Sequence, residues 1–108
     1  MGALVLDPRT GRRHFRETLA AGATGAPVMI GRDILPATVS VYPSAGATGR
    51  IEYTLAPPAD VQAGAATVVW LPWNHGDAGT NAVDVLTGPV TAIRGVATGG
   101  AIDWEVLA

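Results

Sequence analysis

The sequence predicts an all-β protein: a small antiparallel β-sandwich, Ig-like or jelly-roll-like, of about seven strands with an extended N-terminal arm. Short segments alternate apolar and polar side chains with a period of two, which is typical of half-buried strands. Turn sequences rich in glycine and proline separate these segments, and no segment after residue 26 has the length of an ordinary helix. A chain of 108 residues is expected to hold a single sandwich.

The two clearest strands are ATVSVYP, residues 37–43, and RIEYTL, residues 50–55. In the first, Val39 and Val41 share one face and polar side chains the other, and the second alternates in the same way. The connection SAGATG, residues 44–49, is typical of a hairpin. We therefore expect these two strands to pair with each other.

The rest of the chain continues in short strands and turns. We expect loops at residues 56–65 and 74–82, and strands at residues 67–73, 83–86, 90–97 and 101–108. The pair Pro57-Pro58 excludes a central strand from the first loop. In the last strand Ile102, Trp104 and Val106 lie on one face, which predicts that this face is buried.

Residues 1–26 are expected to form a basic arm outside the core, and residues 27–108 the sandwich domain. RRHFRETLAA favours a short helix, which the following glycines and Pro27 end. The arm carries the cluster Arg9, Arg12, Arg13 and Arg16, whereas the rest of the chain is acidic.

A partner-binding role is expected for these four arginines and for Phe15. An acidic protein surface fits an arm on an acidic body better than nucleic acid does. A solvated arm without a partner is the alternative.

The composition indicates a protein whose surface is partly buried in contacts with partner proteins. Charged residues make up 15% of the chain, against about 25% in typical globular domains, and the mean hydropathy is positive. We therefore expect a homo-oligomer or a component of an assembly. No segment reaches the roughly 20 apolar residues that span a bilayer, and the N-terminus lacks the pattern of a signal peptide. We expect synthesis in a cytoplasm and no membrane partner.

The densest stretch of unusual residues is WLPWNHGD, residues 70–77. A metal site would need three or four ligands at fixed spacing, which His75 and Asp77 do not provide. An aromatic platform for a sugar, built on Trp70, Trp73 or Tyr42, is a second interpretation. The third is a strand end and its turn, in which Trp70 is core and Trp73 lies at the rim and binds a partner.

No catalytic motif is present. The chain has no cysteine, and neither Ser40 nor Ser44 lies in a nucleophile motif. The acids are scattered singly along the predicted strands and turns. We expect a protein that is not an enzyme and that binds no metal and no cofactor.

Residues 38–108 resemble small all-β structural proteins of tailed bacteriophages. The resemblance rests on the strand IEYTLAPP, the loop ending AGAAT, the pattern WLPWNHG, the segment LTGPVTAIR, and a glycine-rich turn before the last strand. It implies a component of the virion and identifies no catalytic residue.

The role that the resemblance implies is that of a decoration or cement protein, which binds the major capsid protein and stabilises the head. A head–tail connector or tail component is the first alternative, and a small carbohydrate-binding module the second. The expected location is the virion, assembled in the host cytoplasm, with the major capsid protein or other virion proteins as partners.

Overall fold

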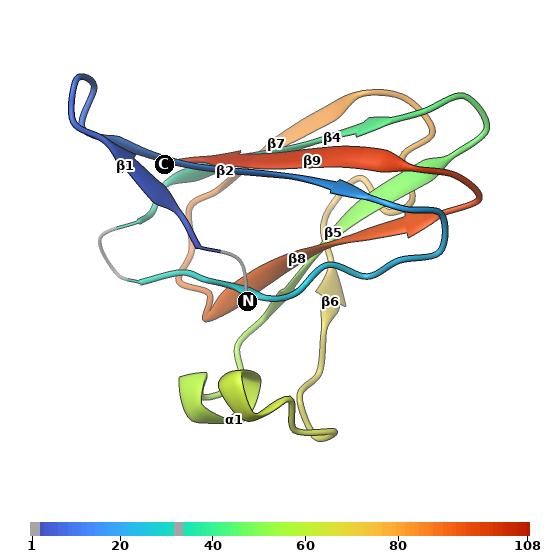
Figure 1. Cartoon of the computed structure of the whole chain (residues 1–108). Coiled ribbons are helices and arrows are strands. Elements are labelled where there is room, and N and C mark those ends of the chain that lie inside the picture. The colour runs from blue at the N-terminus through green and yellow to red at the C-terminus, as the bar shows by residue number, and fades with distance from the viewer. Residues whose placement is uncertain (1–2, 32–33) are drawn as a thin grey trace.

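The computed structural model describes residues 3–31 and 34–108 as two antiparallel sheets packed face to face (Figure 1). The five-stranded sheet contains, in spatial order, β1 (Val5–Asp7), β2 (Arg12–Leu19), β9 (Ile102–Leu107), β4 (Ala37–Pro43) and β7 (Ala82–Leu86). The four-stranded sheet contains β3 (Val28–Met29), β8 (Ala92–Thr98), β5 (Thr48–Thr54) and β6 (Leu71–Pro72). The predicted β-sandwich is confirmed, with nine strands among the described residues.

The core lies between the two sheets and is built from the apolar faces of their strands. Its largest fully buried apolar side chains are Trp104, Ile51, Ile93, Ile102, Val28, Val39, Val41 and Val106. The face predicted to be buried in residues 101–108 is the buried face of β9. Each buried aliphatic side chain of this size stabilises the fold by about 1.5–3 kcal/mol relative to an exposed one.

The predicted hairpin between β4 and β5 is wrong, because the two strands belong to different sheets. β4 pairs with β7 and β9, and β5 pairs with β6 and β8. Residues 44–47 carry the chain across the edge of the sandwich, and Ala47 is buried in the core. Since Val41 and Ile51 both lie on apolar faces, crossing to the opposite sheet lets these faces meet in one core.

The expectation that residues 1–26 form an arm outside the core is also wrong. β2 is the second strand of the five-stranded sheet and pairs with β9 from His14 to Leu19. Its sequence alternates along the strand: Phe15 packs on the ring of Trp104, and Leu19 is buried in the core. This period of two outweighs the helix preference of the segment, so the boundary at residue 26 does not divide the fold.

The predicted loop at residues 56–65 contains a short helix, α1 (Pro58–Ala63), on the excursion between β5 and β6. Proline at the first helical position and Gly64 at the C-terminal end bound it, with Gly64 in the left-handed conformation at φ 67°. The helix lies below the sandwich in Figure 1. Across residues 3–31 and 34–108, no helix is long and apolar enough to cross a membrane.

Candidate interaction surface

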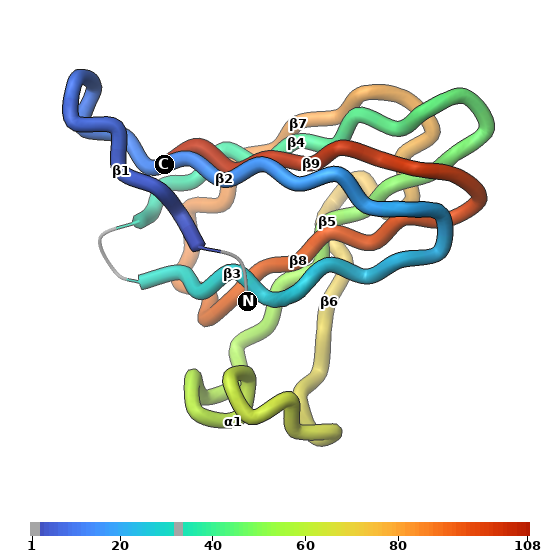
Figure 2. The backbone as a smooth tube through the Cα atoms, in the orientation of Figure 1, coloured from blue at the N-terminus to red at the C-terminus, as the bar shows by residue number. Residues whose placement is uncertain are grey.

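The hairpin of β1 and β2 projects from the sandwich at its turn, residues 8–11 (Figures 1 and 2). Arg9 is exposed on this turn and Arg12 is exposed directly after it at the start of β2, whereas Arg13 is half-buried. The backbone of Arg13 pairs with Ala108 through hydrogen bonds of 2.7 and 2.8 Å, which anchors the base of the hairpin to the end of the chain. The hairpin therefore presents a basic tip on a rigid stem.

The outer face of the five-stranded sheet continues from this hairpin. Strand register places its outward side chains in three rows: Val5, His14, Leu107, Thr38 and Val85; then Arg16, Glu105, Ser40 and Val83; then Thr18, Asp103 and Tyr42. Four aliphatic side chains of these rows are exposed, namely Val5, Leu107, Val83 and Val85. We refer to these twelve residues as the outer face.

Two carboxylates organise the polar part of the outer face. Glu105 accepts hydrogen bonds from the hydroxyl of Tyr42 and, at 2.9 Å, from His14 Nε2. These two bonds, with the nearby charge of Arg16, hold the pKa of Glu105 below its ordinary value. Glu105 is therefore an anion at neutral pH, and each of its two oxygens accepts a hydrogen bond from within the chain.

Asp103 is held in the same manner one row further along β9. It accepts hydrogen bonds from Thr18 Oγ1 at 2.6 Å and from Arg16 Nη2 at 2.9 Å, and these lower its pKa. Arg16 also lies 5.5 Å from the centre of the Tyr42 ring. These contacts hold the side chain of Arg16 between Asp103 and Tyr42 on the outer face.

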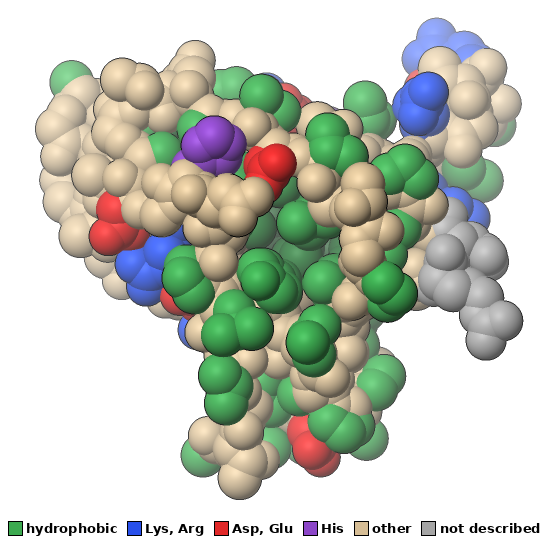
Figure 3. Space-filling model, turned by 180° about the vertical axis from the view of Figure 1, so that it is seen from behind, with side chains coloured by type: hydrophobic (Ala, Val, Ile, Leu, Met, Phe, Trp, Pro, Cys, Tyr) green, Lys and Arg blue, Asp and Glu red, His purple; other side chains and the backbone are tan. Residues whose placement is uncertain are grey.

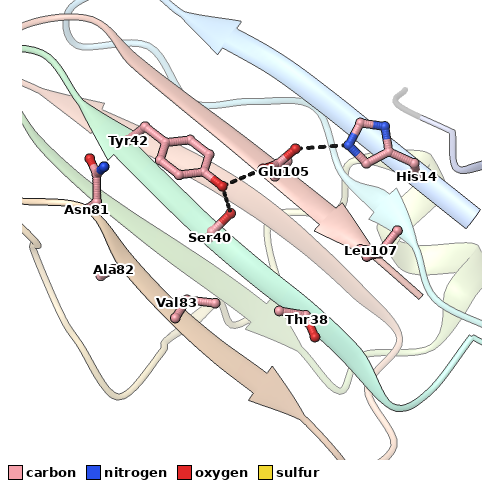
Figure 4. Close-up of a pocket in the computed structure, with 9 residues that line it drawn as sticks. All are labelled: His14, Thr38, Ser40, Tyr42, Asn81, Ala82, Val83, Glu105 and Leu107. Atoms are coloured by element: carbon pink, nitrogen blue, oxygen red, sulfur yellow. Dashed lines mark hydrogen bonds and ion pairs between the residues drawn. The ribbon is translucent and has the colours of Figure 1, made fainter.

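A shallow groove of about 410 Å³ runs over the outer face (Figure 4). It is lined by His14, Thr38, Ser40, Tyr42, Asn81, Ala82, Val83, Glu105 and Leu107. Figure 4 shows Tyr42 directed toward Glu105, and the hydroxyl of Ser40 donates to Tyr42 at 2.9 Å. A nucleophilic serine would instead face a base that takes its proton. The groove can present a mixed apolar and polar contact surface.

The predicted roles of the two tryptophans in WLPWNHGD are reversed in the structure. Trp73, predicted at the rim, is only 4% exposed, and its indole Nε1 donates to the carbonyl oxygen of Gly76 at 2.8 Å. Trp70, predicted as core, is half-buried on the outside of the four-stranded sheet, with the guanidinium of Arg94 4.2 Å from its ring centre. Trp73 therefore provides no exposed platform for a sugar or a partner.

A chain of ion pairs fixes this segment to the four-stranded sheet. Glu52 accepts from Arg50 Nε at 2.9 Å and from Arg94 Nη2 at 2.7 Å, and Arg50 also reaches Asp77 at 2.8 Å. Arg94 stacks on Trp70, so the network holds residues 70–77 at both ends. Residues 70–77 are therefore held against the four-stranded sheet by side-chain contacts.

A second groove, of about 290 Å³, lies between the end of β5, the residues that follow β6, and the end of β7 with the loop after it. Its lining includes Tyr53, Leu55, Trp73, Asp84 and Val85. Seen from behind, apolar side chains gather around a hollow on this side of the molecule (Figure 3). Exposed Leu55, Val69 and Leu71 continue the apolar surface toward α1.

The predicted site residues thus fall in different environments. Arg9 and Arg12 lie on the exposed tip and Arg16 on the outer face, while Phe15 and Trp73 belong to the packing of the core. Alternation in AIDWEVLA could have identified Leu107 as exposed, because it lies on the face of Asp103 and Glu105. Alternation in VDVL predicts the opposite of what is found, since an apolar face of Val83 and Val85 is expected to be buried, whereas both are exposed. Within the part of the chain that the structure describes, no group of three His, Asp or Glu side chains could hold a metal ion.

Comparisons with known proteins find no matching family model and no matching curated protein. Among solved structures, the chain resembles one described as "Bacillus endospore appendages form a novel family of disulfide-linked pili". The TM-score is 0.44 and the sequence identity 12%, over 99% of this chain and 88% of that chain. At these values the likeness indicates neither a family nor a function, and the phage resemblance of residues 38–108 stays a prediction.

Proposed function

We propose that the protein is a non-enzymatic structural subunit that attaches to a larger particle through the tip of its β1–β2 hairpin and its outer face. The exposed aliphatic side chains Val5, Leu107, Val83 and Val85, which lie on one face of one sheet, carry this proposal. Burying these side chains in a partner removes apolar surface from water, which favours association. The basic tip supplies a charge that directs the orientation of docking.

The particle we propose is the head of a tailed phage, with the chain as a decoration or cement protein on the major capsid protein. The sequence pattern of residues 38–108 supports this choice, and an acidic capsid surface would match Arg9 and Arg12. A connector or tail component would use the same surface. The carboxylates Glu105 and Asp103 support a contact role, since each of their oxygens already accepts a hydrogen bond from within the chain.

Co-sedimentation with phage heads assembled without this chain tests the proposal. The variant Leu107→Asp places a charge on the outer face and should weaken binding at least tenfold, because an unpaired charge in a buried contact is costly. Val69→Asp is the matched control, since Val69 is also exposed but lies outside the outer face. Heads that bind both variants as tightly as the parent, or that bind none of the three proteins, would refute the proposed attachment.

A further inference from the structure

The five-stranded sheet ends at β7, which pairs only with β4 among the described strands. In a strand at the edge of a sheet, alternate residues direct their N–H and C=O groups away from the sheet, where they can pair with another chain. In β7 these residues are Val83 and Val85. The carbonyl of Val83 and the N–H of Val85 form hydrogen bonds with side chains and not with β4. The free edge of β7 therefore consists of the backbone groups of Val83 and Val85.

Two of these edge groups are covered by side chains of the same protein. His75 Nε2 lies 2.9 Å from the carbonyl oxygen of Val83, and since a carbonyl only accepts, the imidazole is the donor. Asp84 Oδ1 accepts the N–H of Val85 at 2.8 Å, and Asn74 Nδ2 contacts the other carboxylate oxygen at 3.3 Å. The turn of WLPWNHGD thus lies along the edge of the other sheet.

The side chains of β7 would favour pairing with a second copy of the chain if the edge of this strand were uncovered. Val83 and Val85 are β-branched and are 58% and 50% exposed, so a second β7 could add both backbone pairing and apolar burial. In an antiparallel pair of two β7 strands, Val83 would oppose Val85 of the other copy and bond through the groups just described. Asp84 would then lie directly opposite Asp84 of the other copy, and like charges in that position destabilise the pair.

We propose that His75, Asp84 and Asn74 act together as an edge guard, which keeps β7 from pairing with β7 of a second copy of this chain. His75 occupies the acceptor at Val83, and Asp84 occupies the donor at Val85 and repels its own counterpart. Association of two copies through the edge of β7 is thereby prevented, and any association of the chain takes place through other surfaces. This role is independent of the particle to which the chain attaches.

The double variant His75→Ala, Asp84→Ala removes the guard and should associate through β7. Analytical ultracentrifugation at matched concentrations should show species larger than those of the parent protein, in an amount that rises with concentration. Adding Val85→Pro should restore the parent distribution, because proline removes the N–H that points away from β4 and leaves the pairing with β4 intact. Thr80→Ala, an exposed position in the same connection, serves as the control and should behave as the parent.

Near-ultraviolet circular dichroism checks that the double variant keeps its packed tryptophans. If it does not fold, the single variants His75→Ala and Asp84→Asn are measured in the same way. Each should associate more than the parent, because the first removes the donor to Val83 and the second removes the charge that would repel Asp84 of the other copy. A folded double variant with the distribution of the parent would overturn the proposal. So would larger species that persist after Val85→Pro is added, because they would form through another surface.

Discussion

The indole ring of Trp104 lies against the backbone of Gly95 in the opposite sheet. A Cβ atom built on Gly95 would be 2.6 Å from Cδ1 and 2.7 Å from Nε1 of that ring. The same indole donates to Glu17 Oε1 at 3.0 Å and packs on Phe15 at 5.2 Å between ring centres. Trp104 therefore contacts β8 and β2 from its place in β9. Its position requires a residue without a side chain at Gly95.

The first prediction is that Gly95→Ala destabilises the protein. The added methyl group cannot fit without moving the indole, and overpacking of this kind costs about 1–3 kcal/mol or more. Urea unfolding followed by tryptophan fluorescence measures the loss. Gly88→Ala is the control, because a Cβ at Gly88 meets no atom within 4 Å, and it should leave the free energy of unfolding nearly unchanged.

The second prediction concerns β2, which the sequence predicted to belong to an arm outside the core. Phe15→Ala should lower the free energy of unfolding by about 2–3 kcal/mol, less than for a fully buried ring because Phe15 is half-buried. Arg9→Ala, on the exposed tip, should leave it unchanged within about 0.5 kcal/mol. Equal unfolding midpoints for the two variants in urea would mean that β2 is not part of the folded core.

The third prediction separates the two tryptophans of WLPWNHGD. Trp73→Ala should cost about 3–5 kcal/mol, because it empties a large core position and leaves the carbonyl of Gly76 without its donor. Trp70→Ala should cost about 1 kcal/mol, the typical value of a partly exposed cation–π contact such as that with Arg94. Thermal unfolding of both variants checks the order, and a larger loss in Trp70→Ala would contradict it.

The fold class and the strands of strict alternation could be predicted from the sequence. ATVSVYP and AIDWEVLA each have a single apolar face, and the structure buries those faces in β4 and β9. The sheet partners could not be predicted, since a turn such as residues 44–47 can join strands within one sheet or carry the chain to the other. β2 was missed because arginines and a histidine occupy its outward positions and obscure the inward Phe15 and Leu19.

The contacts of WLPWNHGD could not be read from spacing along the chain. Only Leu71–Pro72 is a strand, so counting alternate faces through residues 67–73 assigned Trp70 and Trp73 to the wrong sides. The bond from His75 to Val83 depends on two sheet edges lying side by side, which is a property of the folded sandwich. Turn residues were recognised correctly, but the edge that they cover was not.

Glu52 is the one acidic side chain among the buried residues of the described chain, and it lies between two arginines. Burial alone would raise the pKa of Glu52, but hydrogen bonds from Arg50 and Arg94 outweigh this effect and hold the pKa below its ordinary value. A carboxyl group with a lower pKa in the folded state binds fewer protons when folded than when unfolded. Its contribution to stability is therefore complete above the unfolded pKa, about 4.3 for glutamate, and is lost as the pH falls through the folded value.

The fourth prediction follows from the lowered pKa of Glu52 in the folded state. The free energy of unfolding should fall as the pH drops below about 4, and Glu52→Gln should lower it at pH 7 by about 1.5–3 kcal/mol, the value of hydrogen bonds to charged groups. The acid loss should be shallower in Glu52→Gln than in the parent, because one of the protonating groups is gone. It should not vanish, since the pKa values of Asp103 and Glu105 are also lowered. Urea unfolding at a series of pH values from 3 to 7 measures both slopes, and identical slopes would show that Arg50 and Arg94 do not hold Glu52 as a carboxylate.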